Sequence, residues 1–536
     1  MVDVASSNAE GGNANHPIHG AGGSAKWFLP LFGVVVLGGL GYVGYALGND
    51  LAEAATVPWI LLGLALLIAL GFEFVNGFHD TANAVATVIY TRSMPAEFAV
   101  IWSGFFNFLG VLTSSGAVAF GILALLPVEL ILQVGSGSGL AMVFALLIAA
   151  IVWNLGTWYL GLPASSSHTL VGSIIGVGLA NQFLAPAGSA TSGVDWSQAS
   201  SVGLSLLLSP LIGFGLAALL LLLVSKALIR NKALYEAPKG NAPPPLWIRT
   251  LLIFTCTGVS FAHGSNDGQK GMGLIMLILI GLVPTAFALN RTPDINYLEA
   301  YKAASTQVES VLGKYVKPGV AAPADPKAAV SDAVKNKTWT DATTPALQAY
   351  IHATGIEIAS YPSVEKLPNG LVGNVRNDIY LIGEALKLID KRKLLPMGAD
   401  DLKAVTQYHA AVDNATKFIP LWVKVAVALA LGLGTMVGWK RIVVTVGEKI
   451  GKTHLTYGQG AAAEVVAMLT IGAADHLGLP VSTTHVLSSG VAGTMAANGS
   501  GLQWSTVRNM LMAWILTLPA SIALAFTLFI VLRQVF

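Results

Sequence analysis

Charged residues are scarce in this chain. Asp, Glu, Lys and Arg make up only 11% of its 536 residues, while apolar residues reach 54%. That charged share is roughly half of what a globular protein usually carries. Several stretches run for about 20 residues without a charge, long enough for a helix to cross ~30 Å of hydrocarbon. The composition excludes a set of soluble domains and predicts an all-α polytopic membrane protein.

Cysteine is nearly absent as well. The single Cys256 excludes an intrachain disulfide and a cysteine-rich metal site. The net charge is only +2, and half of all charged residues lie between Asn290 and Lys417, as 15 Lys or Arg and 14 Asp or Glu. This balance gives no sign of nucleic acid as a partner. The lipid bilayer is the expected partner of the apolar remainder.

Hydropathy predicts about eleven spans. They are 27–47, 56–90, 98–126, 140–160, 162–181, 202–225, 250–288, 418–439, 459–478, 481–498 and 510–533. The first is too long for the core of a signal peptide, and no compact basic region precedes it. We therefore expect a retained helix after a small, polar, disordered tail.

The distribution of Lys and Arg predicts the orientation of these spans. They gather in the short loops near residue 92, at 226–249, at 440–452 and near residue 508, whereas the loops 48–55, 127–139 and 182–201 carry none. With eleven spans, every basic loop falls on the cytoplasmic side. The N-terminus is then cytoplasmic and the C-terminus lies outside.

Two short motifs each occur twice. "GLPASSSHTL" at 161–170 recurs as "GLPVSTTHVL" at 478–487, and "GFHDTANA" at 77–84 aligns without gaps with "GSNDGQKG" at 264–271. The two motifs are 130 residues further apart in the second copy, which matches a polar insertion near 290–417. We therefore expect two repeats of five spans plus one leading helix. On the predicted topology the repeats have opposite orientations, a recurring plan of secondary transporters.

The expected organisation follows from these boundaries. It comprises a disordered tail (1–26), an extra transmembrane helix (27–55), the first repeat (56–230), a cytoplasmic basic linker (231–249), the start of the second repeat (250–289), a polar extramembrane insertion (290–417) and the remainder of the second repeat (418–536). Within the insertion, Asn377–Leu395 has the spacing of an amphipathic helix.

Each "GFHDTANA"-type motif places an aspartate in apolar surroundings, Asp80 in the first and Asp267 in the second. A carboxylate at membrane depth costs roughly 3 kcal/mol or more unless it is paired or solvated. Neighbouring glycines indicate discontinuous helices, which are tolerated only beside a protein-lined cavity. Freed carbonyls and carboxylates suit Na⁺ or a proton-linked site, although each aspartate would also serve as a plain helix cap. The candidate ligands of a coupling cation are His79, Asp80, Thr81, Asn83, Asn266, Asp267 and Glu464.

The other motif pairs a proline with a run of hydroxyl residues and a histidine. Such a run typically starts a helix, and a helix N-terminus offers free N–H groups and partial positive charge to an anion. Plain capping explains one copy; two copies in an inverted repeat favour anion binding. The candidate anion ligands are Ser165, Ser166, Ser167, His168, Ser482, Thr483, Thr484 and His485, with Lys270 as a further cationic candidate that would otherwise pair with Asp267.

These four segments resemble the inorganic phosphate transporter (PiT) family, whose repeats carry a G-x-N-D-x-x-N-A-type motif. Asn76–Met94 and Ala262–Gly273 look closest to its bacterial low-affinity branch. The resemblance implies import of inorganic phosphate across the bacterial inner membrane, in this branch often as a neutral metal–phosphate complex driven by protons. Other branches use Na⁺. It further implies a homodimer, no enzymatic activity and no cofactor beyond the transported ions.

Two departures from the family motif bear on the coupling ion. His79 replaces the motif's first Asn, and Lys270 replaces its later Asn. Both changes remove a neutral oxygen ligand from a Na⁺ site, so we expect H⁺ as the coupling ion, with Na⁺ as the alternative. Competing functions are a sulfate importer, a passive anion channel and an intramembrane hydrolase using Ser167. Adjacent residues on one helix point roughly 100° apart, which argues against a dyad of Ser167 with His168.

Overall fold

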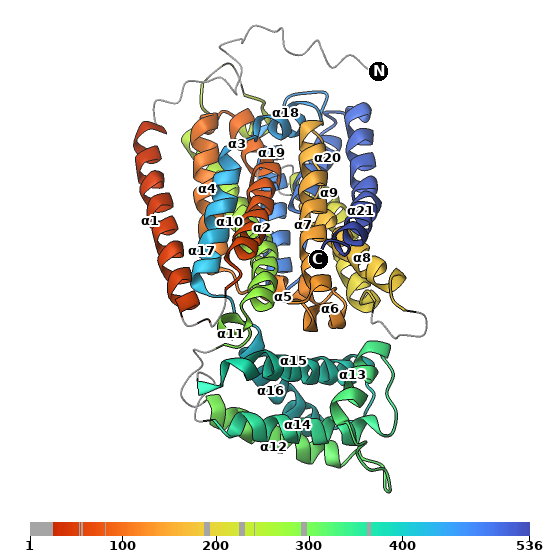
Figure 1. The fold of residues 1–536 in the computed structure, drawn as a ribbon. Coiled ribbons are helices and arrows are strands. Elements are labelled where there is room, and N and C mark those ends of the chain that lie inside the picture. Colours follow the sequence, from red (N-terminus) through yellow and green to blue (C-terminus); the bar gives the residue numbers. More distant parts are fainter. Residues whose placement is uncertain are drawn as a thin grey trace.

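The structure, a computed structural model, describes residues 25–52, 54, 57–80, 82–186, 193–223, 231–238, 240, 242–290, 297–361 and 366–536. These residues form helices and loops without a β-sheet, as predicted. Figure 1 shows two layers, a body of long upright helices and a smaller layer of helices beneath it.

The upright layer, here called the membrane body, contains two sets of helices from either side of the insertion. They are α1 (Ala25–Ala52), α2 (Trp59–Asp80), α3 (Ala82–Tyr90), α4 (Ala96–Thr113), α5 (Ala117–Leu123), α6 (Val128–Leu132), α7 (Gly137–Tyr159), α8 (Ser166–Phe183), α9 (Trp196–Leu220), the 3-10 helix η3 (Lys232–Tyr235), α10 (Leu246–Leu282), α11 (Pro284–Phe287), α17 (Leu421–Met436), α18 (Lys440–Glu448), α19 (Tyr457–His476), α20 (Thr483–Ala497) and α21 (Trp504–Leu532).

Seven helices of the described residues are long and apolar enough to cross a membrane, or eight if α17 and the helix before it count as one bent span. The sequence predicts eleven. The four predicted spans outside the seven correspond to α8, α17, α19 and α20, which are shorter or more polar. The count of eleven therefore stays a prediction. The single span predicted at 98–126 is instead two helices, because the chain turns at Gly116, whose φ of 90° suits only glycine without strain.

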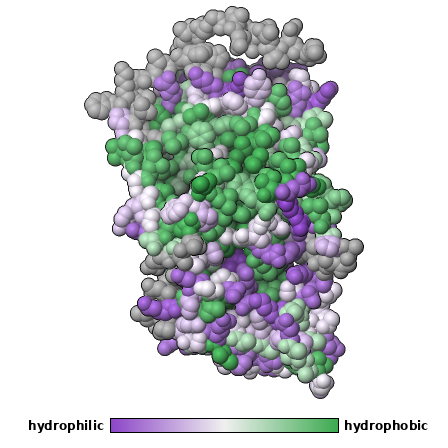
Figure 2. Space-filling view, viewed as in Figure 1, coloured by the Kyte–Doolittle hydropathy of each residue, from purple (hydrophilic) through white to green (hydrophobic). Residues whose placement is uncertain are grey.

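The outer surface of the membrane body is apolar. Figure 2 shows a hydrophobic band across the face in view, with hydrophilic residues gathered at its ends and on the lower layer. On α9, Leu204, Leu207 and Leu211 are 56–64% exposed. Such a continuous apolar surface fits hydrocarbon rather than water. The chain is thus an integral, multi-pass membrane protein.

Packing in the membrane body joins helices far apart in sequence. α8 packs on α21 and α9 packs on α20. Similarly, α4 packs on α10 and α2 packs on α17. α2 leads to α3 at the upper end of the view, whereas α10 leads to α11 at the lower end, so these two helices run in opposite directions (Figure 1).

The sequence predicts a discontinuous helix at Asp267, and this prediction is wrong. α10 continues without a break from Leu246 to Leu282, through the glycines that were expected to interrupt it. An unbroken helix keeps every backbone group bonded within the segment, as hydrocarbon surroundings demand. The glycines allow close packing instead: a methyl group on Gly264 would lie 2.1 Å from the carbonyl oxygen of Asn107 on α4. The interruptions fall elsewhere, between α7 and α8 and between α19 and α20, while residue 81 lies outside the described residues.

The lower layer is formed by the insertion. Its helices are α12 (Tyr297–Gly313), α13 (Pro326–Asn336), α14 (Thr343–Ala359), α15 (Asn369–Arg392) and α16 (Ala399–Thr416). They enclose an apolar core of their own, in which the hydroxyls of Tyr301 and Tyr408 lie 3.0 Å apart. The amphipathic helix expected at 377–395 is part of α15. The layer contacts the membrane body through polar groups, including Lys337 Nζ, 3.2 Å from Asp195 Oδ1.

Candidate functional site

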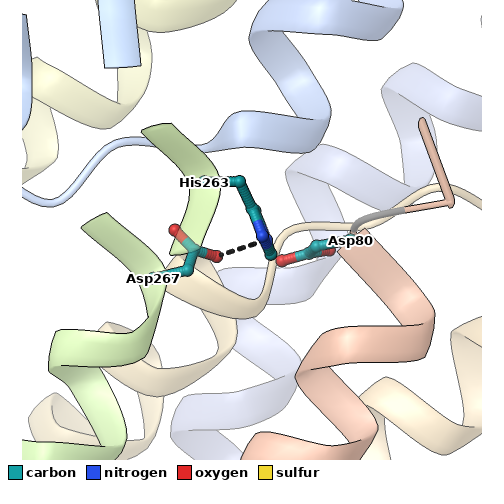
Figure 3. Close-up of side chains that lie close together, drawn as sticks. All are labelled: Asp80, His263 and Asp267. Atoms are coloured by element: carbon teal, nitrogen blue, oxygen red, sulfur yellow. Dashed lines mark ion pairs between the residues drawn. The ribbon is translucent and has the colours of Figure 1, made fainter. Parts of the chain in front are cut away.

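The two aspartates meet inside the membrane body. Asp80 ends α2 and Asp267 lies in the middle of α10; they are 3% and 0% exposed. One side-chain oxygen of each, together with a ring nitrogen of His263, lies within 4.8 Å of the others. Figure 3 shows the three side chains facing one another from two helices. Residues 187 positions apart in sequence therefore share one buried site.

Two helix N-termini point at this pair of acids. Ser165 caps α8 by accepting from the His168 N–H at 3.2 Å, and Ser482 caps α20 by accepting from the His485 N–H at 3.1 Å. The helix dipoles place partial positive charge toward the carboxylates. Each hydroxyl-rich motif therefore caps a helix and also places the start of that helix beside the two carboxylates.

Hydroxyl groups in the first turns of these helices donate to Asp80. Ser166 donates to Asp80 Oδ2 at 2.5 Å, and its oxygen lies 3.5 Å from Asp267 Oδ2. Thr484 donates to Asp80 Oδ1 at 2.8 Å. His79 adds a contact of 3.0 Å between its Nδ1 and Asp80 Oδ1, while its Nε2 lies 3.1 Å from the Thr157 hydroxyl. Side chains from three helices, α2, α8 and α20, therefore surround this carboxylate.

Asp267 has different partners. The ammonium of Lys270 lies 2.7 Å from Asp267 Oδ2, and His263 Nε2 lies 3.3 Å from the same oxygen. Lys270 Nζ also donates to the Ser166 hydroxyl at 3.2 Å. The lysine thus pairs with Asp267, the simpler of the two roles that the sequence suggests for it.

The remaining hydroxyl and histidine residues of the motifs lie beside the acids rather than on them. Ser167 donates to the Val481 carbonyl at 2.8 Å, so it does not form a dyad with His168. The rings of His168 and His485 lie 4.6 Å apart, and His485 stacks on Trp514 at 4.2 Å. Asn266 donates to the Leu479 carbonyl at 3.1 Å. The two motif copies therefore contact each other across the site.

Several buried polar atoms around the site have no hydrogen-bond partner among the described residues. They are Asn266 Oδ1, Asp267 Oδ1, His168 Nδ1, Thr483 Oγ1 and His485 Nε2. An unpaired buried polar atom costs about 1–3 kcal/mol, so such atoms need a partner. The set mixes oxygen acceptors, a hydroxyl and ring nitrogens, which suits both a cation and an oxyanion.

Comparison with known proteins identifies the family. Residues 76–525 match the phosphate transporter family. The low-affinity inorganic phosphate transporter PitA of Escherichia coli (strain K12) is 43% identical over 486 residues, which cover 87% of this chain and 95% of the relative. The chain belongs to the phosphate transporter family.

Other members and one solved structure are similar over comparable lengths. A low-affinity inorganic phosphate transporter of Buchnera aphidicola subsp. Acyrthosiphon pisum is 42% identical over 490 residues, with 87% of this chain and 95% of the relative covered. A solved structure described as the sodium-dependent phosphate transporter has a TM-score of 0.48 and 19% identity, over 89% of this chain and all of that chain. The two bacterial relatives are named as transporters, in agreement with the expectation that the chain is not an enzyme.

Not all of the cation ligands that the sequence predicts lie beside Asp80 and Asp267 in the described structure. Glu464 on α19 is fully buried and accepts hydrogen bonds from the hydroxyls of Thr87 and Thr255, which form a cluster of their own. Thr81 and the side chain of Asn83 lie outside the described residues.

The sequence interpretation overlooked His263. Its Nδ1 lies 2.9 Å from Asn107 Oδ1 and its Nε2 faces Asp267, so the ring bridges α4 and the acid pair. A signal was present, because the gap-free alignment of the motifs pairs His263 with Asn76, another polar residue in an apolar run. The histidine lies one position outside the eight-residue motif and was therefore not nominated.

Proposed function

We propose that this chain imports inorganic phosphate by cation symport, with the coupling cation held at Asp80 and Asp267. A single observation carries the proposal: two carboxylates, one from each repeat, and two helix N-termini meet in one buried site. Carboxylates alone would repel phosphate. A cation between them and the anion removes that repulsion, so the two substrates need each other.

The phosphate side of the site is formed by the starts of α8 and α20. Free N–H groups at two helix N-termini favour an anion, and the hydroxyls of Ser166, Thr483 and Thr484 add donors. His168 and His485 contribute ring nitrogens without partners in the described part of the chain. This donor set suits a tetrahedral oxyanion better than a linear or planar one, because donors approach from two helices.

The cation side is formed by Asp80, His263 and Asp267. Carboxylate oxygens with an imidazole nitrogen hold a proton, and they also suit a divalent metal that travels with phosphate. Na⁺ prefers oxygen ligands throughout, so we favour H⁺ and keep Na⁺ as the alternative. A metal in a neutral metal–phosphate complex would be substrate rather than a resident cofactor.

Shared hydroxyl groups provide the coupling between the two sides. A hydroxyl can donate only one hydrogen bond, and the Ser166 and Thr484 hydroxyls both donate theirs to Asp80. A cation that neutralises Asp80 weakens its hold on these protons, which then become available to phosphate. We therefore expect the cation to bind first.

The architecture supplies a route to alternating access. Matching the repeats pairs α2 with α10, α4 with α17, α7 with α19, α8 with α20 and α9 with α21. Under this matching the contact of α8 with α21 corresponds to that of α20 with α9, and α4 with α10 corresponds to α17 with α2. These equivalent contacts and the opposite directions of α2 and α10 support an inverted repeat. Movement of one half against the other would expose the site to each side in turn.

Uptake of labelled phosphate into proteoliposomes tests the function. We expect uptake driven by an imposed proton gradient, competition by phosphate analogues and little effect of sulfate. Uptake that follows a sodium gradient instead would establish the Na⁺ alternative, and strong competition by sulfate would favour a sulfate importer. Uptake that persists without either cation gradient, driven by phosphate alone, would identify a passive channel and contradict symport.

The proposal includes the setting of the protein. We place it in the bacterial inner membrane as a homodimer, with the N-terminus and the basic loops in the cytoplasm. Helix α18 and the start of α21, which carry basic residues, lie at the same end of the membrane body as the start of α1, and the insertion lies at the other end (Figure 1). The mass of the detergent-solubilised complex tests the dimer.

A further inference from the structure

Lys270 lies at the centre of the site and is fully buried. Its ammonium lies 2.7 Å from Asp267 Oδ2 and 3.2 Å from the Ser166 hydroxyl oxygen. That hydroxyl in turn reaches Asp80. The ammonium is therefore surrounded by the kind of oxygen atoms that also ligate small hard cations.

The first repeat has an uncharged residue at the position that matches Lys270. The gap-free alignment pairs Lys270 with Asn83, and α2 and α10 begin at the same distance before their aspartates. One repeat thus carries a neutral amide, which can ligate a cation through its oxygen. The other carries an ammonium, which cannot be a cation ligand but is itself a cation.

The positive charge of the Lys270 ammonium offsets the negative charge of the carboxylates around it. Three carboxylates lie on α2 and α10 near this position: Asp80, Asp267 and Glu73, whose side chain occupies the space left by Gly271. A methyl group on Gly271 would lie 2.5 Å from Glu73 Oε1. Lys270 is the one Lys or Arg that the described structure places in contact with this group. Without it, a further cation would have to enter with each phosphate, because adjacent buried carboxylates cannot all stay ionised alone.

We propose that Lys270 is a tethered cation that fills one cation position of the transport site. Its ammonium takes the place beside Asp267 and Ser166 that a small monovalent ion, Na⁺ or Li⁺, occupies when residue 270 is neutral. The inference rests on the proposed symport at Asp80 and Asp267, and it concerns how many mobile cations move with phosphate. The wild-type carrier moves one fewer than a carrier with a neutral residue at this position.

Sodium binding by purified, full-length protein tests this inference without requiring transport. The Lys270→Asn variant carries the residue found at the matched position 83. We expect it to bind one more radioactive Na⁺ per chain than the wild type at equilibrium, and to gain thermal stability in NaCl relative to choline chloride. Lys270→Arg keeps the fixed charge and should bind no additional Na⁺.

Two further variants keep the test falsifiable. In the double variant Asp267→Asn with Lys270→Asn the extra Na⁺ should be lost, because its carboxylate ligand is gone. Lys424→Asn serves as a matched control: this lysine of α17 donates to the Ser114 carbonyl at 2.7 Å, away from the acid pair, and its removal should add no Na⁺.

The outcomes separate this inference from the proposed function. A folded Lys270→Asn protein with no additional Na⁺ and no Na⁺-specific stabilisation overturns it, as does an equal gain in Lys424→Asn. Uptake by Lys270→Asn that requires external Na⁺ or Li⁺, where wild-type uptake does not, supports it further. Failure of the wild type to take up phosphate would instead refute the proposed function, since the binding measurement does not depend on that activity.

Discussion

At Asp80, side chains from elements far apart in sequence converge on one buried carboxylate. Ser166 and Thr484 come from the first turns of α8 and α20, and His79 precedes the aspartate on α2. Each hydrogen bond to a charged group contributes about 1.5–3 kcal/mol, which offsets part of the cost of removing the carboxylate from water. The same contacts make the site sensitive to any cation that competes for the carboxylate.

Replacement of either aspartate tests the acid pair. Asp80→Asn and Asp267→Asn should each lower phosphate uptake by about tenfold or more, equivalent to roughly 1.4 kcal/mol of lost transition-state stabilisation. The amide cannot take up a proton or hold a cation in the same way. Uptake by purified variants in liposomes measures the effect, with membrane insertion checked separately; normal rates for both would exclude coupling at these residues.

Replacement of two hydroxyl residues tests the anion side. Ser482→Ala with Thr483→Ala should raise the phosphate concentration needed for half-maximal uptake, because the first removes the cap of α20 and the second a hydroxyl without a partner among the described residues. Loss of the cap alone costs about 1 kcal/mol. Ser209→Ala is the control, since Ser209 bonds only within its own helix, to the Leu206 carbonyl, in the described contacts. An unchanged half-saturating concentration would remove the pair from the phosphate site.

At the scale of helices, close approach positions the site. α10 packs on α4, and Gly264 and Gly110 lie where the two backbones come close together. Glycine in a helix costs about 1 kcal/mol relative to alanine, so its presence needs a compensating contact. That contact brings Asn107 within reach of His263 and thereby fixes the ring beside Asp267.

Adding a methyl group at this contact should separate the helices. Gly264→Ala would place its Cβ 2.1 Å from the Asn107 carbonyl oxygen, whereas Gly472→Ala on α19 meets nothing within 4 Å. We expect Gly264→Ala to lose uptake and to unfold at a lower temperature, with overpacking costing about 1–3 kcal/mol. Gly472→Ala should match the wild type. Equal behaviour of the two variants would show that the helices are not held at this distance.

The contact between the insertion and the membrane body should depend on pH. Burial raises the pKa of Asp195, but the Gln198 N–H and the nearby ammonium of Lys337 outweigh burial and hold the pKa below its ordinary value. Because the folded-state pKa is depressed, the stabilisation is fully present above the unfolded pKa of about 3.9 and disappears as pH falls through the folded value.

Asp195→Asn imitates the protonated state at neutral pH. We expect it to lower the unfolding temperature near neutral pH, and this difference from the wild type to shrink in acid, once the wild-type carboxylate is itself protonated. Asp390→Asn is the control, since Asp390 pairs with Lys393 on the surface and such pairs contribute little. A difference between Asp195→Asn and the wild type that does not change with pH would contradict this account.

At the scale of the whole molecule, polar and apolar surfaces separate the two layers. The apolar band crosses the visible face of the membrane body, and the insertion forms a more polar layer at the end opposite the start of α1 (Figures 1 and 2). A membrane around the band leaves the insertion in water on one side only. Helix α18, which begins with Lys440 and Arg441, lies at the other end, and we propose that this end faces the cytoplasm because basic residues mark the inner side of a membrane protein.

Cysteine labelling tests this orientation. Cys256 is fully buried, so single cysteines can be introduced with little background from it. Lys317→Cys, exposed in the insertion, should react with a membrane-impermeant maleimide added to intact spheroplasts, whereas Lys452→Cys, exposed after α18, should react only after lysis. The reverse labelling pattern would show that the protein has the opposite orientation in the membrane.

The sequence alone determined the class of protein, the repeated motifs and the candidate acids, because hydropathy, motif spacing and the cost of a buried carboxylate are properties of short segments. Only the tertiary structure decided which groups meet. It selected Ser166 and Thr484, which are not equivalent in the two motif copies, as the donors to Asp80, and it added His263 to the pair. It also kept α10 unbroken and set Glu464 in a separate cluster. Such contacts depend on the register of helices hundreds of residues apart, which local sequence patterns do not encode.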